Sequence, residues 1–342
     1  MRAYVQTALG RFEERDLPVP RPAAGEVVLR VRLALTCGTD LKLLRRGHAR
    51  ISYPVTMGHE VCGDVVELGE GVAPDLLGKR VVPGVTGPCG ACADCRHGFG
   101  NLCAAGQADR TWGAFAEFVR VPAGVVAASL HRPAASLSDE AAAFLDPLAS
   151  VLHGWNRLGA PVPERLLIYG SGGLALLWAA TARARGVPAI VAGRRPDRLS
   201  LAAGCGAEVL DLGRHEPEDL FSRTGALPAA AVDCTGDPGV WMRLPNLLRH
   251  GGRVLLFGGC APGVQVSFDA ARLHYAEMAL IGSFHYTPEE ARAAMAMLAA
   301  REVDPRPLVT EVGTLSDLPR FLEAQGRGEG VRYAVRPAGG AP

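Results

Sequence analysis

Residues Leu166–Ala175 of the 342-residue chain read LLIYGSGGLA, and this stretch decides how the second half folds. Four apolar residues typical of a buried strand lead into a G-x-G-x-x-A turn and then an apolar helical stretch. In such a unit Gly170 makes the tight turn and Gly172 lets the backbone approach a pyrophosphate at the helix amino terminus. We therefore predict a dinucleotide-binding loop that also includes Gly173 and Leu174.

A glycine-rich turn alone is weak support, because any tight strand–helix connection can use glycine. Here the turn belongs to a series of apolar strands, and alanine- and leucine-rich helical stretches separate the first few of these strands. The strands expected after Leu166–Tyr169 are Ala189–Ala192, Glu208–Leu210, Ala231–Cys234, Arg253–Phe257 and Leu280–Ser283. Six such strands predict an α/β fold with a doubly wound parallel sheet, the Rossmann arrangement.

The end of the second strand bears on which dinucleotide is bound. NAD enzymes carry an acid there for the ribose 2′-hydroxyl, whereas this chain has Gly193, followed by Arg194 and Arg195. Guanidinium groups can hold a 2′-phosphate with two hydrogen bonds each. We therefore favour NADP(H) over NAD(H); the alternative is that these are ordinary surface residues of an arginine-rich chain.

The rest of the chain has a different rhythm. Residues 1 to about 145 form short alternating runs such as Val61–Leu68, broken by Gly and Pro, which predicts a β-barrel-like unit. A helix is expected over Glu289–Ala300. Because the chain is too long for one ordinary core, we expect two domains, a catalytic domain of residues 1–150 and 289–342 and a dinucleotide-binding domain of residues 151–288.

Bulk composition excludes several classes of protein. The net charge of +1 does not favour nucleic acid, and the most apolar stretch, Leu166–Ala184, is interrupted by glycines and Arg183, which argues against a membrane span. A strand-like pattern begins at Met1, so we expect no signal peptide. Nine cysteines, four of them clustered, favour metal binding in a reducing compartment, and we expect a cytoplasmic protein.

The clustered cysteines are Cys89, Cys92, Cys95 and Cys103, in a C-x2-C-x2-C-x7-C pattern. Two-residue gaps let neighbouring thiolates converge on one tetrahedral ion, and four ligands leave no open coordination position. We therefore predict a structural zinc. A redox dithiol needs fewer cysteines, and a nucleic-acid zinc module fits poorly with the neutral charge balance.

Two shorter runs lie upstream, Cys37–Asp40 (CGTD) and Gly58–Glu60 (GHE), and a third, Asp146–Ala149 (DPLA), lies downstream. None is informative alone, because a single His or Cys is more often packed than a ligand. Together with the four cysteines, their order resembles the zinc-dependent medium-chain dehydrogenase/reductase family. The similarity extends over nearly the whole chain and is greatest to the polyol (sorbitol-like) branch. It implies that the barrel-like domain is GroES-like.

The resemblance implies a catalytic zinc in addition to the structural one. Cys37 and His59 would ligate it, and Glu60 would ligate it directly or lie just outside. Asp146 stands where the family has glutamate and is one methylene shorter, so it would bind directly or through a water. Asp40 would accept the other ring N–H of His59.

Three protein ligands and an exchangeable position suit a Lewis-acid site that lowers the pKa of an alcohol before hydride transfer to a nicotinamide. Thr39 would hydrogen-bond the substrate hydroxyl and start a proton relay. Lys42 lies where relatives often have a histidine later in that relay; the alternative is a solvated lysine, although the chain has only one other, Lys79.

Other segments would border the cofactor and substrate. Cys234 and Thr235 stand at the end of the fourth strand, and this strand end borders the nicotinamide in the family. The substrate pocket would include Thr39, Trp112, Phe115 and His285, the last at a position where polyol-type relatives often carry arginine. The aromatic residues are equally consistent with core packing, and His285 with an ordinary hydrogen-bonded histidine.

The resulting hypothesis is an oxidoreductase that moves a hydride between NADP(H) and a secondary, polar alcohol or ketone of the polyol, sugar or cyclitol type. A homodimer or homotetramer is expected from the resemblance. One alternative is a zinc-independent quinone or enone reductase of the same fold, which the set Cys37, His59 and Glu60 disfavours. Another is a non-catalytic protein that binds zinc and dinucleotide only structurally, which the change from Glu to Asp keeps open.

Overall fold

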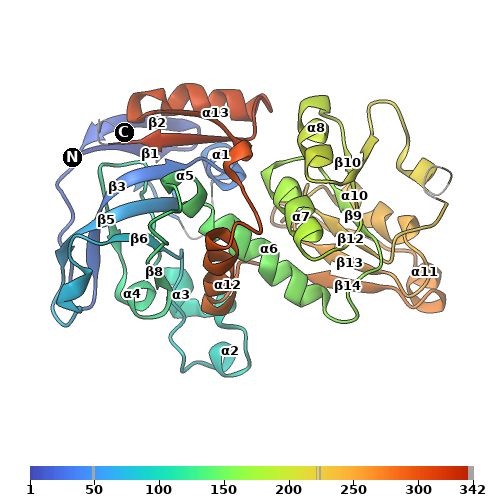
Figure 1. Ribbon diagram of the computed structural model, residues 1–342, viewed down its shortest axis with the longest axis horizontal. Helices are drawn as coiled ribbons and strands as arrows, with labels where there is room; N and C mark the ends of the chain where they lie inside the picture. Colours follow the sequence, from blue (N-terminus) through green and yellow to red (C-terminus); the bar gives the residue numbers. More distant parts are fainter. Residues whose placement is uncertain (48–50, 221, 223–224, 338–342) are drawn as a thin grey trace. The chain divides into compact units, whose positions relative to one another are not determined.

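The computed structural model describes residues 1–47, 51–220, 222 and 225–337. The chain forms two compact units (Figure 1). The first contains Met1–Ala149 and Tyr286–Pro342, and the second contains Ser150–His285.

The second unit is built on a six-stranded, entirely parallel sheet of order β11-β10-β9-β12-β13-β14. Its strands are β9 (Leu166–Tyr169), β10 (Ala189–Gly193), β11 (Glu208–Asp211), β12 (Ala230–Asp233), β13 (Arg253–Leu256) and β14 (Ala279–Gly282). All six predicted strands are thus confirmed to within one residue at either end. The strand order reverses between β9 and β12, the kind of position where open α/β sheets bind their ligands.

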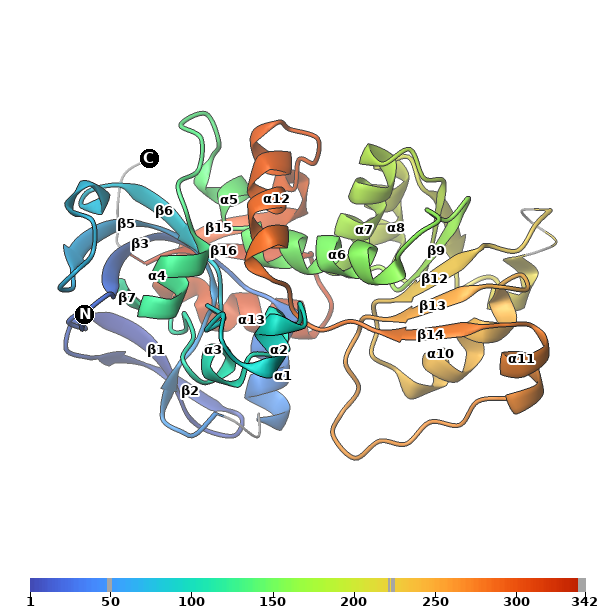
Figure 2. The same ribbon diagram turned by 90° about the horizontal axis from the view of Figure 1, so that it is seen from below.

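Helices cover both faces of this sheet. In Figure 2, α7 (Gly173–Ala184) and α8 (Pro196–Gly204) lie on one face and α10 (Pro238–Arg243) lies on the other. Because both faces are covered, every residue of β9 and β12 is buried, which explains why these strands are apolar runs without alternation. The unit also contains η3 (Pro217–Asp219), η4 (Leu244–Leu247) and α11 (Ala270–Tyr275).

The first unit is rich in β structure, as predicted. Its larger sheet has the order β15-β16-β3-β5-β6-β8, with β7 also paired to β3, and its smaller sheet has the order β2-β1-β4. The strands are β1 (Arg2–Ala8), β2 (Arg11–Asp16), β3 (Val27–Leu35), β4 (Val55–Thr56), β5 (Glu60–Leu68), β6 (Arg80–Pro83), β7 (Phe118–Val121), β8 (Leu130–His131), β15 (Val309–Thr314) and β16 (Arg332–Arg336). The sheets enclose one apolar core that includes Leu29, Val65, Phe115, Phe321 and Tyr333.

Short helices connect the strands of this unit. They are α1 (Gly38–Arg46), η1 (Pro74–Leu76), α2 (Ala93–Arg96), η2 (Gly100–Leu102), α3 (Ala104–Ala108), α4 (Ala123–Ser129), α5 (Asp139–Ala142), α12 (Pro288–Ala299), η5 (Arg306–Leu308), η6 (Leu315–Asp317) and α13 (Leu318–Gly326). The predicted helix after Pro288 is confirmed as α12, and Glu290 caps its start by accepting from the Thr287 amide over 2.8 Å. Helix α6 (Leu145–Leu158) spans the boundary between the units.

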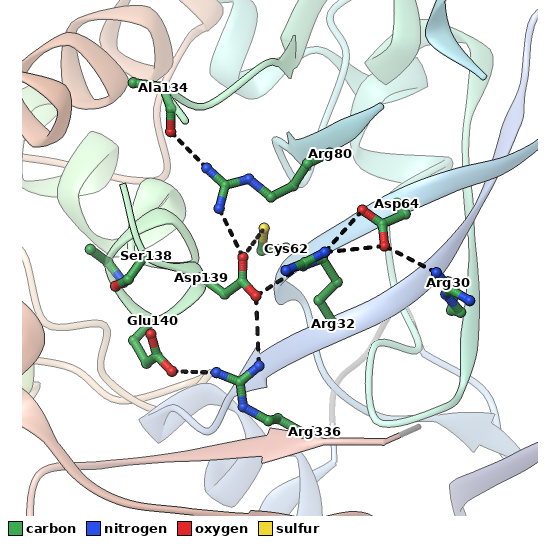
Figure 3. A network of polar contacts seen from close by, with 11 residues as sticks. Arg30, Arg32, Cys62, Asp64, Arg80, Ala134, Ser138, Asp139, Glu140 and Arg336 are labelled. Carbon is green, nitrogen blue, oxygen red and sulfur yellow. Dashed lines mark hydrogen bonds and ion pairs between the residues drawn. The ribbon is translucent and has the colours of Figure 1, made fainter. Parts of the chain in front are cut away.

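A buried carboxylate joins α5 to three strands of the larger sheet (Figure 3). Asp139 accepts from Arg32 Nε of β3 over 2.9 Å and from Arg80 Nη1 of β6 over 3.1 Å, and Arg336 Nη1 of β16 lies 3.6 Å away. Burial alone would raise the pKa of Asp139, but the Arg32 hydrogen bond and the three guanidinium charges outweigh burial and lower it. The network fixes α5 a few residues before α6 begins.

Among the residues that the structure describes, no helix is both long and apolar enough to cross a lipid bilayer.

Candidate functional site

Cys37 and His59 face each other in the interior of the β-rich unit. The Cys37 Sγ lies 3.4 Å from the His59 Nε2, and the two side chains are buried. Tetrahedral zinc with ordinary Zn–S and Zn–N bonds would separate a sulfur and a nitrogen ligand by about 3.6 Å. The spacing therefore fits a metal between these two atoms.

Strand pairing brings these residues together. Strands β3 and β5 are antiparallel, and their register pairs Leu35 with Glu60. Cys37 follows the end of β3 and His59 precedes the start of β5, so both project from the same end of the ladder. Cys37 is also the N-cap of α1, where its Sγ accepts from the Thr39 amide over 3.2 Å.

Asp40 supports the arrangement from the first turn of α1. Its Oδ2 accepts from the Cys37 amide over 2.8 Å, and its Oδ1 lies 3.7 Å from the His59 Nδ1. Among the described residues, that Oδ1 and that Nδ1 are both buried without a hydrogen-bond partner. Burial lowers the pKa of His59, but the neighbouring Cys37 and Asp40 outweigh burial and raise it well above its usual value. The predicted Asp40 support therefore has the right partner, and the two unpaired atoms suit a histidine whose other nitrogen holds a metal.

Glu60 has a partner that the sequence did not reveal. The buried Arg332 Nη1 lies 2.8 Å from each carboxylate oxygen of Glu60 and also donates to the Thr36 carbonyl over 2.8 Å. Burial raises the pKa of Glu60 to about 7, against the lowering effect of Arg332 and with a further contribution from Asp146. Arg332 begins β16 and lies 272 residues after Glu60, so no local pattern signals this pair.

Asp146 reaches the same cluster despite its shorter side chain. Ligand atoms of His59, Glu60 and Asp146 all lie within 4.8 Å of one another. The Tyr286 hydroxyl accepts from the Val85 amide over 3.0 Å and is hydrogen-bonded to Asp146. Burial, and then the charge of Asp146, raise the pKa of Tyr286 well above its usual value, so this hydroxyl stays protonated and donates to the carboxylate. Tyr286 was not predicted, because a single tyrosine shortly after a strand has no distinctive pattern.

The residues predicted for the relay and the substrate pocket have varied environments. Thr39 and Lys42 are exposed on α1. Trp112 is half-buried and stacks on the imidazole of His59. Phe115 is fully buried in the core, so it has no surface to offer a substrate and does not belong to the proposed pocket. His285 is partly exposed and has a left-handed backbone with φ of 58°.

The four cysteines of the predicted structural site converge in a lobe around α2 and α3. Their sulfur atoms all lie within 4.8 Å of one another, and Cys89 Sγ is 3.9 Å from Cys95 Sγ. Two sulfur ligands of a tetrahedral zinc would be about 3.8 Å apart. The backbone amides of Ala91 and Cys92 lower the pKa of Cys89 to about 6, which favours the thiolate that a metal requires. The donor set and its spacing therefore fit a zinc with four sulfur ligands.

The glycine-rich loop has the backbone that the sequence predicts. Gly170 has a φ of 114° directly after β9, and Gly172 is the N-cap of α7 with no atom close to where a Cβ would be. Gly173 and Leu174 form the first turn of α7, so their amides lie at the positive end of its dipole. The loop therefore leaves backbone donors and open space for a phosphate.

Gly193 ends β10, and a side chain there would collide with this loop. A Cβ on Gly193 would lie 2.6 Å from both Cβ and Oγ of the buried Ser171. Arg194 is exposed, and Arg195 is partly exposed with its Nε 3.8 Å from Asp197. Any side chain at position 193 would therefore force Ser171 to move, a constraint that the sequence did not reveal.

The comparison with known proteins agrees with this architecture. Two family models match the chain, "Alcohol dehydrogenase GroES-like domain" over residues 23–130 and "Zinc-binding dehydrogenase" over residues 173–300. A sorbitol dehydrogenase of Halalkalibacterium halodurans is 30% identical, with 98% of this chain and 99% of that protein covered.

The chain belongs to the zinc-dependent medium-chain dehydrogenase/reductase family.

Other relatives extend this result. A D-altritol 5-dehydrogenase of Agrobacterium fabrum is 32% identical, covering 83% of this chain and 84% of that protein. A structure from Sinorhizobium meliloti 1021, described as a zinc-binding dehydrogenase bound to NADP, matches with a TM-score of 0.88 and 26% identity, covering 98% of this chain and 99% of that one. This medium-chain dehydrogenase is accordingly a zinc-dependent alcohol dehydrogenase that uses a nicotinamide cofactor.

In this dehydrogenase the loop after β12 depends on a carboxylate that sequence reasoning missed. The fully buried Asp233 accepts from the amide and hydroxyl of Thr235 over 2.9 and 2.6 Å, and from the Gly236 amide and Trp241 Nε1 over 2.9 and 2.8 Å. Cys234, one of the predicted cofactor contacts, adjoins Gly170, where an added Cβ would lie 3.4 Å from the Cys234 Cβ. Asp233 thus fixes the loop that carries Cys234 and Thr235, two of the predicted cofactor contacts.

Proposed function

We propose that the protein oxidises a secondary alcohol of a polyol, sugar or cyclitol, or reduces the corresponding ketone, with NADP(H) and a catalytic zinc. The observation that carries this proposal is the 3.4 Å approach of the Cys37 Sγ to the His59 Nε2 in a buried site. The proximity of Asp146 to His59 supports a third contact at the same position, made directly or through a water. The lobe of four cysteines would hold a second, structural zinc.

A bound zinc supplies Lewis acidity, which lowers the pKa of a nearby alcohol and lets a hydride leave for the nicotinamide. The chain's own residues would do the rest. Asp40 would keep the Nδ1 of His59 protonated, which leaves Nε2 as the ligand atom. Arg332 would neutralise Glu60, so that the site does not gather two uncompensated carboxylates. The Thr39 hydroxyl would accept the proton of the substrate hydroxyl and pass it outward, and Lys42 is our proposed later member of that relay.

The cofactor preference rests on the end of β10. A carboxylate side chain at position 193 would repel a 2′-phosphate. Such a side chain would also collide with Ser171, because its Cβ would lie 2.6 Å from the Ser171 Cβ and Oγ. The neighbouring Arg194 is exposed and able to contact a phosphate, and Arg195 follows it. The S. meliloti structure bound to NADP supports the same preference.

The choice of substrate class rests on the relatives. Two of them act on sorbitol and on D-altritol by their names, and both are polyols. His285 is our candidate for a substrate contact, because the family resemblance implies that it lines the substrate pocket; it lies three residues after β14.

Metal analysis and a kinetic panel test the proposal together. We expect two zinc ions per chain in the purified enzyme, and oxidation of polyols with a kcat/KM at least about tenfold higher for NADP than for NAD, equivalent to about 1.4 kcal/mol. A single zinc per chain in zinc-replete enzyme would overturn the catalytic site. A clear advantage for NAD would overturn the cofactor assignment.

Paired variants separate the steric and the electrostatic parts of the cofactor argument. Gly193→Asp alone should lower stability, because its Cβ meets Ser171. Ser171→Gly with Gly193→Asp should recover stability and shift the preference toward NAD. Ser171→Gly alone is the matched control and should keep the preference for NADP. If the double variant kept the original preference, Gly193 would have no role in cofactor choice.

A further inference from the structure

We propose that Trp112 is a positioning residue for the metal centre: its indole holds the imidazole of His59 in the orientation that binds zinc and slows the release of that zinc. This inference rests on the proposed catalytic site at Cys37 and His59. It adds a residue that neither the ligand set nor the sequence motif contains.

The geometry places the indole against one face of the imidazole. The ring centroids of Trp112 and His59 are 4.7 Å apart and the ring planes are 3° from parallel. The edges of the imidazole have separate partners, since Nε2 faces Cys37 and Nδ1 faces Asp40. Cys37 and Asp40 therefore constrain the ring within its plane, and Trp112 constrains its tilt.

The backbone fixes Trp112 relative to His59. The amides of Gly113 and Ala114 both donate to the Gly58 carbonyl, over 2.8 and 3.0 Å. The residue before the histidine and the residues after the tryptophan are thus joined directly. Gly58 has a φ of 93°, and a Cβ there would lie 2.8 Å from the Phe115 amide nitrogen, so this close contact requires glycine. The stack is built into the fold.

The chemistry of the two rings explains why the stack would favour the bound metal. A metal-bound imidazole carries part of the cation's charge, and the face of an indole attracts positive charge more strongly than that of any other side chain. The Trp112 Nε1 is buried and has no hydrogen-bond partner among the described residues, so the indole does not act on His59 through a hydrogen bond. We infer that it acts through its ring face, which predicts that phenylalanine retains much of the effect.

Zinc release from the holoenzyme tests the inference. We would follow the transfer of zinc to a chromophoric chelator for the wild type, Trp112→Leu, Trp112→Phe and the control Trp178→Phe. Trp178 also has a buried indole nitrogen without a partner among the described residues, but it lies on α7 in the other unit. Zinc in the four-cysteine lobe is an internal reference that should leave at the same rate in every variant.

Removal of a group that orients a metal ligand typically weakens metal binding 10- to 100-fold, so we expect release from the Cys37 site to be about 10-fold faster in Trp112→Leu. Trp112→Phe should accelerate it by only about 2- to 5-fold, because phenylalanine keeps a weaker aromatic face. Cobalt-substituted Trp112→Leu should also show shifted visible absorption bands, whereas Trp178→Phe should not.

Three results would overturn the inference and leave the proposed function intact: unchanged release in Trp112→Leu, equal acceleration in the Leu and Phe variants, or unchanged cobalt bands in Trp112→Leu. Wild-type enzyme that holds zinc only in the lobe would instead overturn the proposed function. If Trp112→Leu fails to fold, Trp112→Phe alone decides, and unchanged release and unchanged cobalt bands in that variant overturn the inference.

Discussion

The two clusters of candidate metal ligands are built in opposite ways. The cysteine lobe is made of Cys89, Cys92, Cys95 and Cys103, which lie within 15 residues and are joined by turns and short helices. The mixed cluster is made of Cys37, His59, Glu60 and Asp146: His59 is grouped with Cys37 on one side and with Glu60 and Asp146 on the other, and these residues come from three separate segments of the β-rich unit. A local lobe can assemble around its ion, whereas the mixed cluster exists only when the larger fold is complete.

Their surroundings differ in the same sense. In the lobe, Cys89 is exposed and Cys92 and Cys95 are partly exposed, and the backbone amides of neighbouring residues are the main cause of the lowered pKa of Cys89. In the mixed cluster, the charge of Glu60 is balanced by Arg332, which arrives on β16. The difference indicates that residues close in sequence support the lobe, whereas the mixed cluster depends on residues far away in the sequence.

The largest expected effect separates the roles of the two clusters. Cys37→Ser should lower kcat/KM by about 1,000-fold or more, because the Lewis acid contributes several kcal/mol to the barrier. Zinc content should fall from two to one per chain, with thermal unfolding nearly unchanged. Steady-state kinetics and metal analysis check this result, and activity within tenfold of the wild type would contradict the assignment of Cys37.

The next effect tests the long-range support. Arg332→Met should lower the free energy of unfolding by about 3–5 kcal/mol, because it leaves the buried Glu60 without its partner. Chemical unfolding followed by circular dichroism measures this loss. The double variant Glu60→Gln with Arg332→Met is the matched control and should recover part of it; an equally unstable double variant would show that Arg332 acts by packing alone.

Disruption of the lobe should have a smaller and different effect. Cys103 is the buried member of the set, and Cys103→Ser should cost about 2–3 kcal/mol of stability through loss of the metal. The surviving enzyme should keep its kcat within about twofold, because the mixed cluster does not include this residue. A fall in kcat as large as that of Cys37→Ser would show that the two clusters are coupled.

This contrast also explains what the sequence could predict. The cysteine spacing and the G-x-G-x-x-A turn are local patterns, and the six parallel strands follow from apolar runs, so all of these are readable from the chain alone. Arg332, Tyr286 and Ser171 are not, because each acts through a residue brought near by the fold: Glu60, Asp146 and Gly193. The stack of Trp112 on His59 has the same origin, since it depends on the pairing of two backbone segments that are far apart in sequence.

The smallest effect concerns the carboxylate that anchors α5 ahead of Asp146. The pKa of Asp139 is lowered in the folded protein, chiefly by Arg32 once the opposing effect of burial is overcome. Its contribution to stability is therefore fully present above the unfolded pKa of about 3.9 and is lost as the pH falls through the lower, folded value.

Asp139→Asn should cost about 1–2 kcal/mol at pH 7, and the difference from the wild type should shrink below about pH 4. Unfolding measured between pH 3 and 7 gives both curves. Asp304→Asn, which breaks an exposed ion pair with Arg306, is the control and should change stability by less than about 1 kcal/mol. A gap between Asp139→Asn and the wild type that stayed constant down to pH 3 would mean that shape, and not charge, holds α5 in place.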